Sequence, residues 1–177
     1  MKKAIIIFTF LPVFIFAGHK NILKLKYGKL TIKVNIKNWT FRKKARIRNG
    51  RAFIIAGPKI NSHKYRLSVT PSIGIVIEKL RNKPNPIIYF TIKRNMLGIR
   101  KNIIKMYSNS DHFITMPNSM GCLGKIKPNP NVILNRLVVT SVYGKYGIFI
   151  ICDSVEDTYK RVEKDIHNIL KSIKLVS

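Results

Sequence analysis

Alternation of apolar and polar residues is the feature of this sequence that most constrains its fold. From Leu30 to Lys37 every second residue is apolar, so one face of an extended segment would be buried while the other faces water. The same alternation recurs in residues 64–70, with Leu67 among the inward positions, and in residues 88–93. These segments predict half-buried β-strands, a pattern typical of an antiparallel sheet with one solvated face.

The last third of the chain carries the clearest pattern. Two runs rich in β-branched residues, Leu137–Tyr143 and Ile148–Cys152, flank a glycine-bounded turn and predict a β-hairpin. After it, apolar residues recur at helical spacing from residue 159 to residue 173, which predicts an amphipathic helix. Ser154 and Asp157 have the spacing of a capping box, and we expect them to begin that helix.

Shorter patterns extend the predicted sheet. Ile22–Lys26 is expected to form a short strand that turns at Gly28, and Ala52–Ala56 a buried strand. Residues 73–80 fit a strand or a helix, and residues 95–130 are the hardest to assign, with residues 103–107 and 113–116 as short strand candidates. We therefore expect an α+β fold, in which an antiparallel sheet of about five to seven strands is packed by the C-terminal helix.

The first eighteen residues predict export. Met1-Lys2-Lys3 is a basic start, and the uncharged apolar stretch from Ala4 to Gly18 completes the pattern of a secretory signal peptide. The stretch is shorter than the about 20 residues that a membrane span needs. We therefore divide the chain into a signal, residues 1–18, and a single domain, residues 19–177, that is periplasmic or secreted. An uncleaved membrane anchor through residues 4–18 stays open as an alternative.

Charge is the second strong feature. The chain has 34 Lys and Arg against 7 Asp and Glu, a formal net charge of +27, and residues 18–77 contain no acid. This balance excludes an acidic tail or a carboxylate-rich metal enzyme. It favours an anionic partner, which would be a membrane surface, a glycolipid or an acidic protein. A solvated basic face without a binding role is the competing interpretation.

The basic run at residues 42–51 and the outward positions of the predicted strands supply the candidate contacts. We also expect Lys37 and Lys93 to point away from the core, because they occupy polar positions of alternating segments. The candidate anion-binding residues are Arg42, Lys43, Lys44, Arg46, Arg48, Arg51, Lys33, Lys64 and Arg66.

Two segments carry a resemblance to a known fold group. The C-terminal hairpin and the helix ending in Ile169–Ile173 resemble the last third of PsbP-like proteins, which include bacterial periplasmic proteins of the DcrB type. The turn at Tyr27-Gly28, the strand to Ile36 and the following Asn38-Trp39 resemble the start of the same group. The resemblance implies an antiparallel sheet flanked by helices, and non-catalytic accessory or binding roles in the envelope. It carries over no catalytic residue.

The two cysteines leave several interpretations open. In an oxidising compartment Cys122 and Cys152 could form a disulfide, and otherwise they would be buried thiols. Alternatively, Cys122 with Asp111 and His112 could supply the nucleophile and base of a secreted hydrolase or thiol enzyme.

Other residue types give little sign of a site. The four histidines show no metal-ligand spacing, and His167 is expected on the polar side of the C-terminal helix. Trp39 is expected in the core rather than in a ligand pocket. We therefore predict no cofactor and no metal, and we keep non-specific nucleic-acid binding as a further alternative. The sequence thus predicts an exported, non-enzymatic envelope binding or accessory protein with a strongly basic surface.

Overall fold

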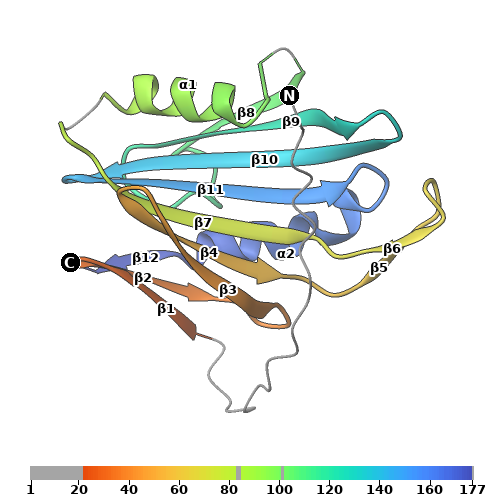
Figure 1. Ribbon diagram of the computed structural model, residues 1–177, viewed down its shortest axis with the longest axis horizontal. Coiled ribbons are helices and arrows are strands. Elements are labelled where there is room, and N and C mark those ends of the chain that lie inside the picture. The colour runs from red at the N-terminus through yellow and green to blue at the C-terminus, as the bar shows by residue number, and fades with distance from the viewer. Residues whose placement is uncertain (1–21, 83–84, 101, 177) are drawn as a thin grey trace.

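A seven-stranded antiparallel sheet lies at the centre of the fold (Figure 1). The computed structural model describes residues 22–82, 85–100 and 102–176, so the predicted signal peptide lies outside the described residues. The strands of this large sheet are β3 (Thr40–Ile47), β4 (Gly50–Ala56), β7 (Ser72–Lys79), β8 (Ile103–Ser108), β9 (Ser119–Asn129), β10 (Val132–Tyr143) and β11 (Tyr146–Val155). Their order is β3-β4-β7-β11-β10-β9-β8, which makes β3 and β8 the two edges.

A smaller sheet joins the two ends of the described chain. Its strands are β1 (Ile22–Tyr27), β2 (Leu30–Asn35) and β12 (Lys174–Val176), with β2 in the centre. Leu30, Ile32 and Val34 are fully buried, whereas the residues between them are partly exposed, which confirms the alternation predicted for this strand.

One face of the large sheet packs against helix α2 (Tyr159–Lys171) and the inner face of the small sheet. The buried positions of α2 include Val162, Ile166 and Leu170, at the spacing that predicted this helix. The predicted hairpin is also confirmed, as β10 and β11. Trp39 is 3% exposed and belongs to the same core, as expected.

Helix α1 (Pro86–Met96) covers part of the opposite face, over β9 and β10. Phe90 of α1 packs there with Cys122 and Val138 in a second, smaller core. The strand predicted for residues 88–93 is therefore wrong. Pro86 stands in the first helical turn and the Asn85 side chain accepts a hydrogen bond from a backbone N–H, so the local signals favour a helix start despite the β-branched composition.

Two further predictions, for residues 64–70 and for the start of the C-terminal helix, are wrong. Residues 64–70 do not add to the large sheet, because β5 (Ile60–Ser62) and β6 (Leu67–Val69) pair in a separate hairpin where Leu67 is 45% exposed. The capping box is also absent. Helix α2 begins after Thr158 without a side-chain cap, and the Asp157 carboxylate accepts hydrogen bonds from β5 and the following turn instead.

The segments without a clear assignment are strands of the large sheet. Residues 73–80 lie mostly in β7, and much of residues 95–130 forms β8 and β9. The strand candidate at residues 103–107 is confirmed as part of β8, whereas the candidate at residues 113–116 is wrong, because this segment lies between the two strands. Strand β7 has consecutive buried residues, so alternation does not mark it, and irregular register interrupts the pattern in β8 and at the β9–β10 turn. Figure 1 shows the outcome: α1 and β8 lie at one end of the molecule, and the small sheet and β3 lie at the other.

Candidate functional site

The outer face of the small sheet carries a row of lysines. Lys33 on β2 is the register partner of Lys24 on β1 and of Lys174 on β12. Residues directly opposite each other in an antiparallel pair have Cβ atoms about 4.5–5.5 Å apart, and like charges in such pairs are destabilising. Lys33 is half-buried between two exposed lysines. We call these three residues the lysine ladder, and an anion bound to it would relieve their repulsion.

The neighbouring edge strand β3 extends the positive surface. Lys44 and Arg46 are paired with Phe53 and Arg51 of β4, and Phe53 belongs to the core on the side of the small sheet. Lys44 and Arg46 are therefore on the same face of the large sheet as β1. Arg51 joins the two sheets, because its Nη1 donates a hydrogen bond to the backbone oxygen of Lys26 at 3.0 Å.

No acidic side chain occurs between residues 22 and 56 or on β12. Several acids elsewhere in the described residues already have cationic partners. Glu78 lies 2.7 Å from the Nζ of Lys93, and Asp153 accepts two hydrogen bonds from Arg136, at 2.7 and 2.6 Å. The lysine ladder together with Lys44 and Arg46 is therefore a set of cations on strands that carry no acid. We refer to these five residues as the basic surface.

The structure brings together only part of the predicted contact set. Lys33, Lys44, Arg46 and Arg51 lie on or beside the basic surface. The other members of the basic run, Arg42, Lys43 and Arg48, are exposed on β3 or in the turn after it. Sequence analysis missed Lys24 and Lys174, because the alignment of β12 with β2 joins residues from the two ends of the described chain.

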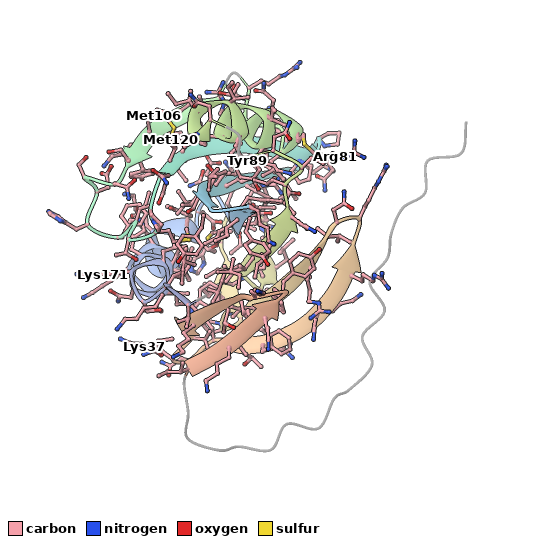
Figure 2. The ribbon with its side chains drawn as sticks, turned by 90° about the vertical axis from the view of Figure 1, so that its left-hand side faces the viewer. Lys37, Arg81, Tyr89, Met106, Met120 and Lys171 are labelled. Carbon is pink, nitrogen blue, oxygen red and sulfur yellow. The ribbon has the colours of Figure 1, made fainter. Side chains whose placement is uncertain are left out.

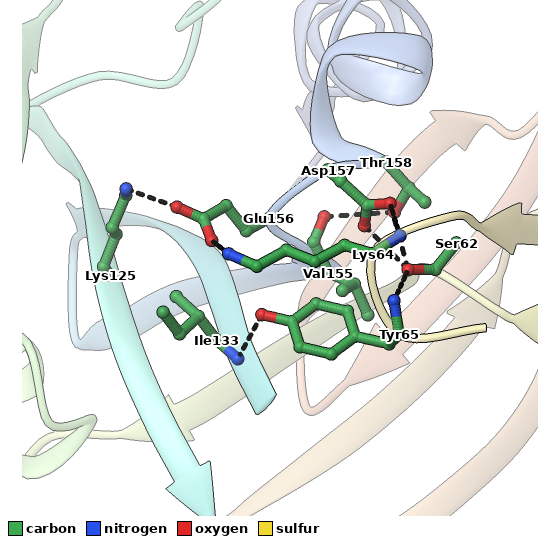
Figure 3. A network of polar contacts seen from close by, with 9 residues as sticks. All are labelled: Ser62, Lys64, Tyr65, Lys125, Ile133, Val155, Glu156, Asp157 and Thr158. Atoms are coloured by element: carbon green, nitrogen blue, oxygen red, sulfur yellow. Dashed lines mark hydrogen bonds and ion pairs between the residues drawn. The ribbon is translucent and has the colours of Figure 1, made fainter. Parts of the chain in front are cut away.

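Lys64 and Arg66 lie apart from the basic surface, in the turn between β5 and β6. Lys64 lies 2.7 Å from Glu156, which also contacts Lys125 at 2.5 Å (Figure 3). The hydrogen bonds from Lys125 and Lys64 hold the pKa of Glu156 below its usual value, and the contact with Glu156 raises the pKa of Lys64. Lys64 thus serves a local network that fixes the β5–β6 hairpin.

Lys93 does not point away from the core as predicted. Its side chain is 10% exposed, it pairs with Glu78, and its Nζ lies 4.5 Å from the ring centre of Phe149. The helical geometry of α1 turns Lys93 toward the sheet, on the same side as the buried Tyr89 and Phe90.

The cysteines form neither a disulfide nor a reactive pair. Both are free and buried. Cys122 is paired with Val138 and Cys152 with Leu137, which are consecutive residues of β10, so the two thiols point to opposite faces of the sheet. They also stand two strand spacings apart, about 10 Å, which is beyond disulfide reach. Of the two alternatives left open by the sequence, the structure has the two buried thiols.

The same geometry removes the basis of the thiol-enzyme alternative. Cys122 faces α1, whereas Asp111 and His112 line a cleft beside α2 on the other face. Burial raises the pKa of the Cys122 thiol to about 11, so little thiolate is present at neutral pH.

That cleft has a volume of about 570 Å³. The Phe113 ring in its wall stacks on His167 with centroids 3.9 Å apart. His167 is therefore half-buried rather than on a fully polar side of the helix, and burial lowers its pKa. The cleft is broad and open, with Lys105, Lys160 and Lys171 also in its lining.

Within the described ranges, no three His, Cys, Asp or Glu side chains come together as a metal site would require. Neither α1 nor α2, the two helices of the described residues, has the length and apolar character to cross a membrane.

Comparison with known proteins identifies similar folds. No family model matches the chain, and no curated protein matches it in sequence. LpqN of Mycobacterium tuberculosis, which is involved in cell envelope biogenesis, is similar over 90% of this chain and 93% of its own, with a TM-score of 0.61 at 10% identity. A protein of Bacteroides thetaiotaomicron is similar over 82% of this chain and 45% of its own, with a TM-score of 0.49 at 9% identity. At such identity the likeness to LpqN shows the fold alone, and the resemblance to PsbP-like proteins stays a prediction.

Proposed function

We propose that this chain is an exported, non-enzymatic accessory protein of the cell envelope that binds phosphate-bearing lipid or glycolipid headgroups through its basic surface. The observation that carries the proposal is the lysine ladder. Three lysines held in cross-strand register, with no acid on the same sheet, form an arrangement whose repulsion an anion would relieve.

An envelope location has two supports. The first eighteen residues match the pattern of a secretory signal. The fold is also shared with LpqN, a protein involved in cell envelope biogenesis. A binding role fits better than catalysis, because Cys122, the nucleophile of the enzymatic alternative, is buried away from its candidate base.

Headgroup phosphates suit the geometry of the basic surface. The ladder occupies the exposed side of a sheet rather than a pocket, so it can meet a layer of anions. Each cation close to an anionic membrane surface contributes on the order of 1 kcal/mol before salt screening. Removal of five such cations is therefore expected to weaken binding at low salt by roughly two orders of magnitude or more.

The test compares two variants that lose the same charge. The surface variant replaces the basic surface by glutamine: K24Q, K33Q, K44Q, R46Q and K174Q. The control variant removes exposed lysines elsewhere: K127Q, K145Q, K160Q, K164Q and K171Q. Arg51 is left in place because it holds the two sheets together through Lys26.

Cosedimentation with vesicles containing phosphatidylglycerol measures the outcome. We expect the surface variant to bind much more weakly than the control variant, which should keep most of the wild-type binding, with circular dichroism showing that both are folded. Equal losses in the two variants would mean that net charge, rather than this surface, determines binding, and the proposal would then be abandoned.

A further inference from the structure

Helix α1 exposes a line of large apolar side chains. Ile88, Ile92 and Met96 are 57%, 50% and 71% exposed, respectively. Their spacing of four residues places them along one side of the helix, away from the side that buries Phe90 and Lys93. We call these three residues the apolar stripe.

The exposed apolar surface continues onto the neighbouring edge strand. Strand β8 pairs with β9, on which α1 packs, and its exposed Met106 (45%) is the register partner of Cys122, which faces α1. Figure 2 shows Met106 beside α1. With Ile87, five of the nine large hydrophobic side chains exposed in the described residues lie on α1 or on the side of β8 next to it. Exposed apolar side chains that gather in one place are typical of an interaction site, whereas single scattered ones are not.

The charge around α1 limits which kind of partner can bind the apolar stripe. Residues 79–110 contain no acid, and the nearby Glu78 is paired with Lys93 at 2.7 Å. Arg81 and Arg100 are exposed before and after α1 in sequence, whereas Arg94 lies on the side of the helix that carries the buried Phe90, 5.7 Å from its ring centre. An apolar stripe beside unneutralised cations matches the boundary between acyl chains and anionic headgroups. A second copy of this chain, with net charge +27, would be repelled.

We propose that α1 and the adjoining Met106 of β8 dock on an anionic lipid bilayer, with the apolar stripe inserted at the acyl boundary and the exposed Arg81 and Arg100, which flank the helix in sequence, among the headgroups. This docking surface is distinct from the basic surface. Strands β8 and β3 are opposite edges of a seven-stranded sheet, separated by about 29 Å at the usual strand spacing. A bilayer that receives α1 therefore leaves the lysine ladder free for a second anionic partner, which goes beyond the function proposed above.

Fluorescent labelling of the full chain tests insertion directly. Native Cys122 and Cys152 are buried, so an environment-sensitive dye would attach to the new thiol of I92C, or to that of L67C as the control. Leu67 is equally apolar and exposed, but it lies on the β5–β6 hairpin. With vesicles of phosphatidylglycerol and phosphatidylcholine, we expect a several-fold rise in emission at position 92, quenched by brominated acyl chains, and no rise at position 67.

A pair of triple variants adds a second readout. I88Q/I92Q/M96Q removes the apolarity of the stripe, whereas I88L/I92L/M96L retains it, and both glutamine and leucine are good helix formers. We expect the glutamine variant to bind these vesicles at least tenfold more weakly than the leucine variant.

These experiments distinguish docking through α1 from binding through the basic surface. A dye at position 92 that still responds when the five basic-surface residues are replaced would support docking through α1. Cosedimentation without any response at position 92 would overturn it and leave binding through the basic surface standing. Equal binding by the two triple variants would overturn it as well.

Discussion

Replacing Lys33 by glutamine is expected to stabilise the protein. Lys33 has two cross-strand lysine partners, Lys24 and Lys174. A cross-strand pair is worth roughly 0.2–1 kcal/mol, so the loss of two like-charge pairs should raise the free energy of unfolding by about 0.5–1.5 kcal/mol. For a chain of this size that corresponds to an increase in Tm of about 2–5 °C.

Salt distinguishes this effect from a change in packing or strand propensity. In about 1 M NaCl the Debye length is about 3 Å, so the repulsion between neighbouring lysines is largely screened and most of the gain should disappear. The matched control is K127Q, on β9, because no Lys or Arg is a register partner of Lys127 in the described strands. K127Q should change stability by less than about 0.5 kcal/mol.

Urea unfolding followed by circular dichroism, at low and at high salt, provides the measurement. If K33Q is no more stable than K127Q at low salt, or if its gain is unchanged at high salt, the reasoning about the lysine ladder is refuted. K33Q should also bind anionic vesicles less well, because the charge of Lys33 that repels Lys24 and Lys174 is also expected to attract the anionic headgroups.

Three other predictions concern buried groups. Neither Cys122 nor Cys152 should react with a thiol reagent in the folded protein, and both should react after unfolding, because burial raises both pKa values and hides both sulfurs. E78Q should destabilise the protein by about 2–4 kcal/mol in urea unfolding, since it leaves the charge of the buried Lys93 without its partner. The free energy of unfolding should fall as the pH drops below about 6.5, in part because burial keeps the pKa of His167 below its usual value, so the unfolded chain takes up that proton first.

Each of these three has a control. Fewer than two reactive thiols after unfolding without reductant would contradict the assignment of two free cysteines. E163Q breaks a pair in which Lys160 is 87% exposed and should cost less than about 0.5 kcal/mol, so an equal loss in E78Q would contradict the role of burial. H167F keeps a ring against Phe113 and should show a smaller loss of stability between pH 7 and pH 5 than the wild type; an identical slope would contradict the part assigned to His167.

Periodicity predicted the elements whose two faces have different surroundings. Strand β2 and helix α2 each bury one face, and their buried residues follow the period of the element. Every second residue is buried in β2, from Leu30 to Val34, and Val162 and Ile166 are four residues apart in α2. Helix α1 could not be found in the same way. It exposes Ile88, Ile92 and Met96, so its apolar residues do not mark its buried face.

The basic surface could be predicted only in part. Outward positions on single strands are visible in the sequence, and Lys33 was assigned in this way. The ladder itself requires the register between β2 and β12, which are separated by most of the chain. Partners distant in sequence also explain why Lys64 was misplaced, since its acid, Glu156, is 92 residues away.

Binding through the basic surface is tested most directly by lysine acetylation of the bound protein, followed by mass spectrometry. Anionic vesicles should protect Lys24, Lys33, Lys44 and Lys174 from the reagent, whereas Lys127 and Lys164 should stay as reactive as in the free protein. Uniform protection of all six lysines, or no protection of the ladder while the protein is bound, would contradict the proposed function.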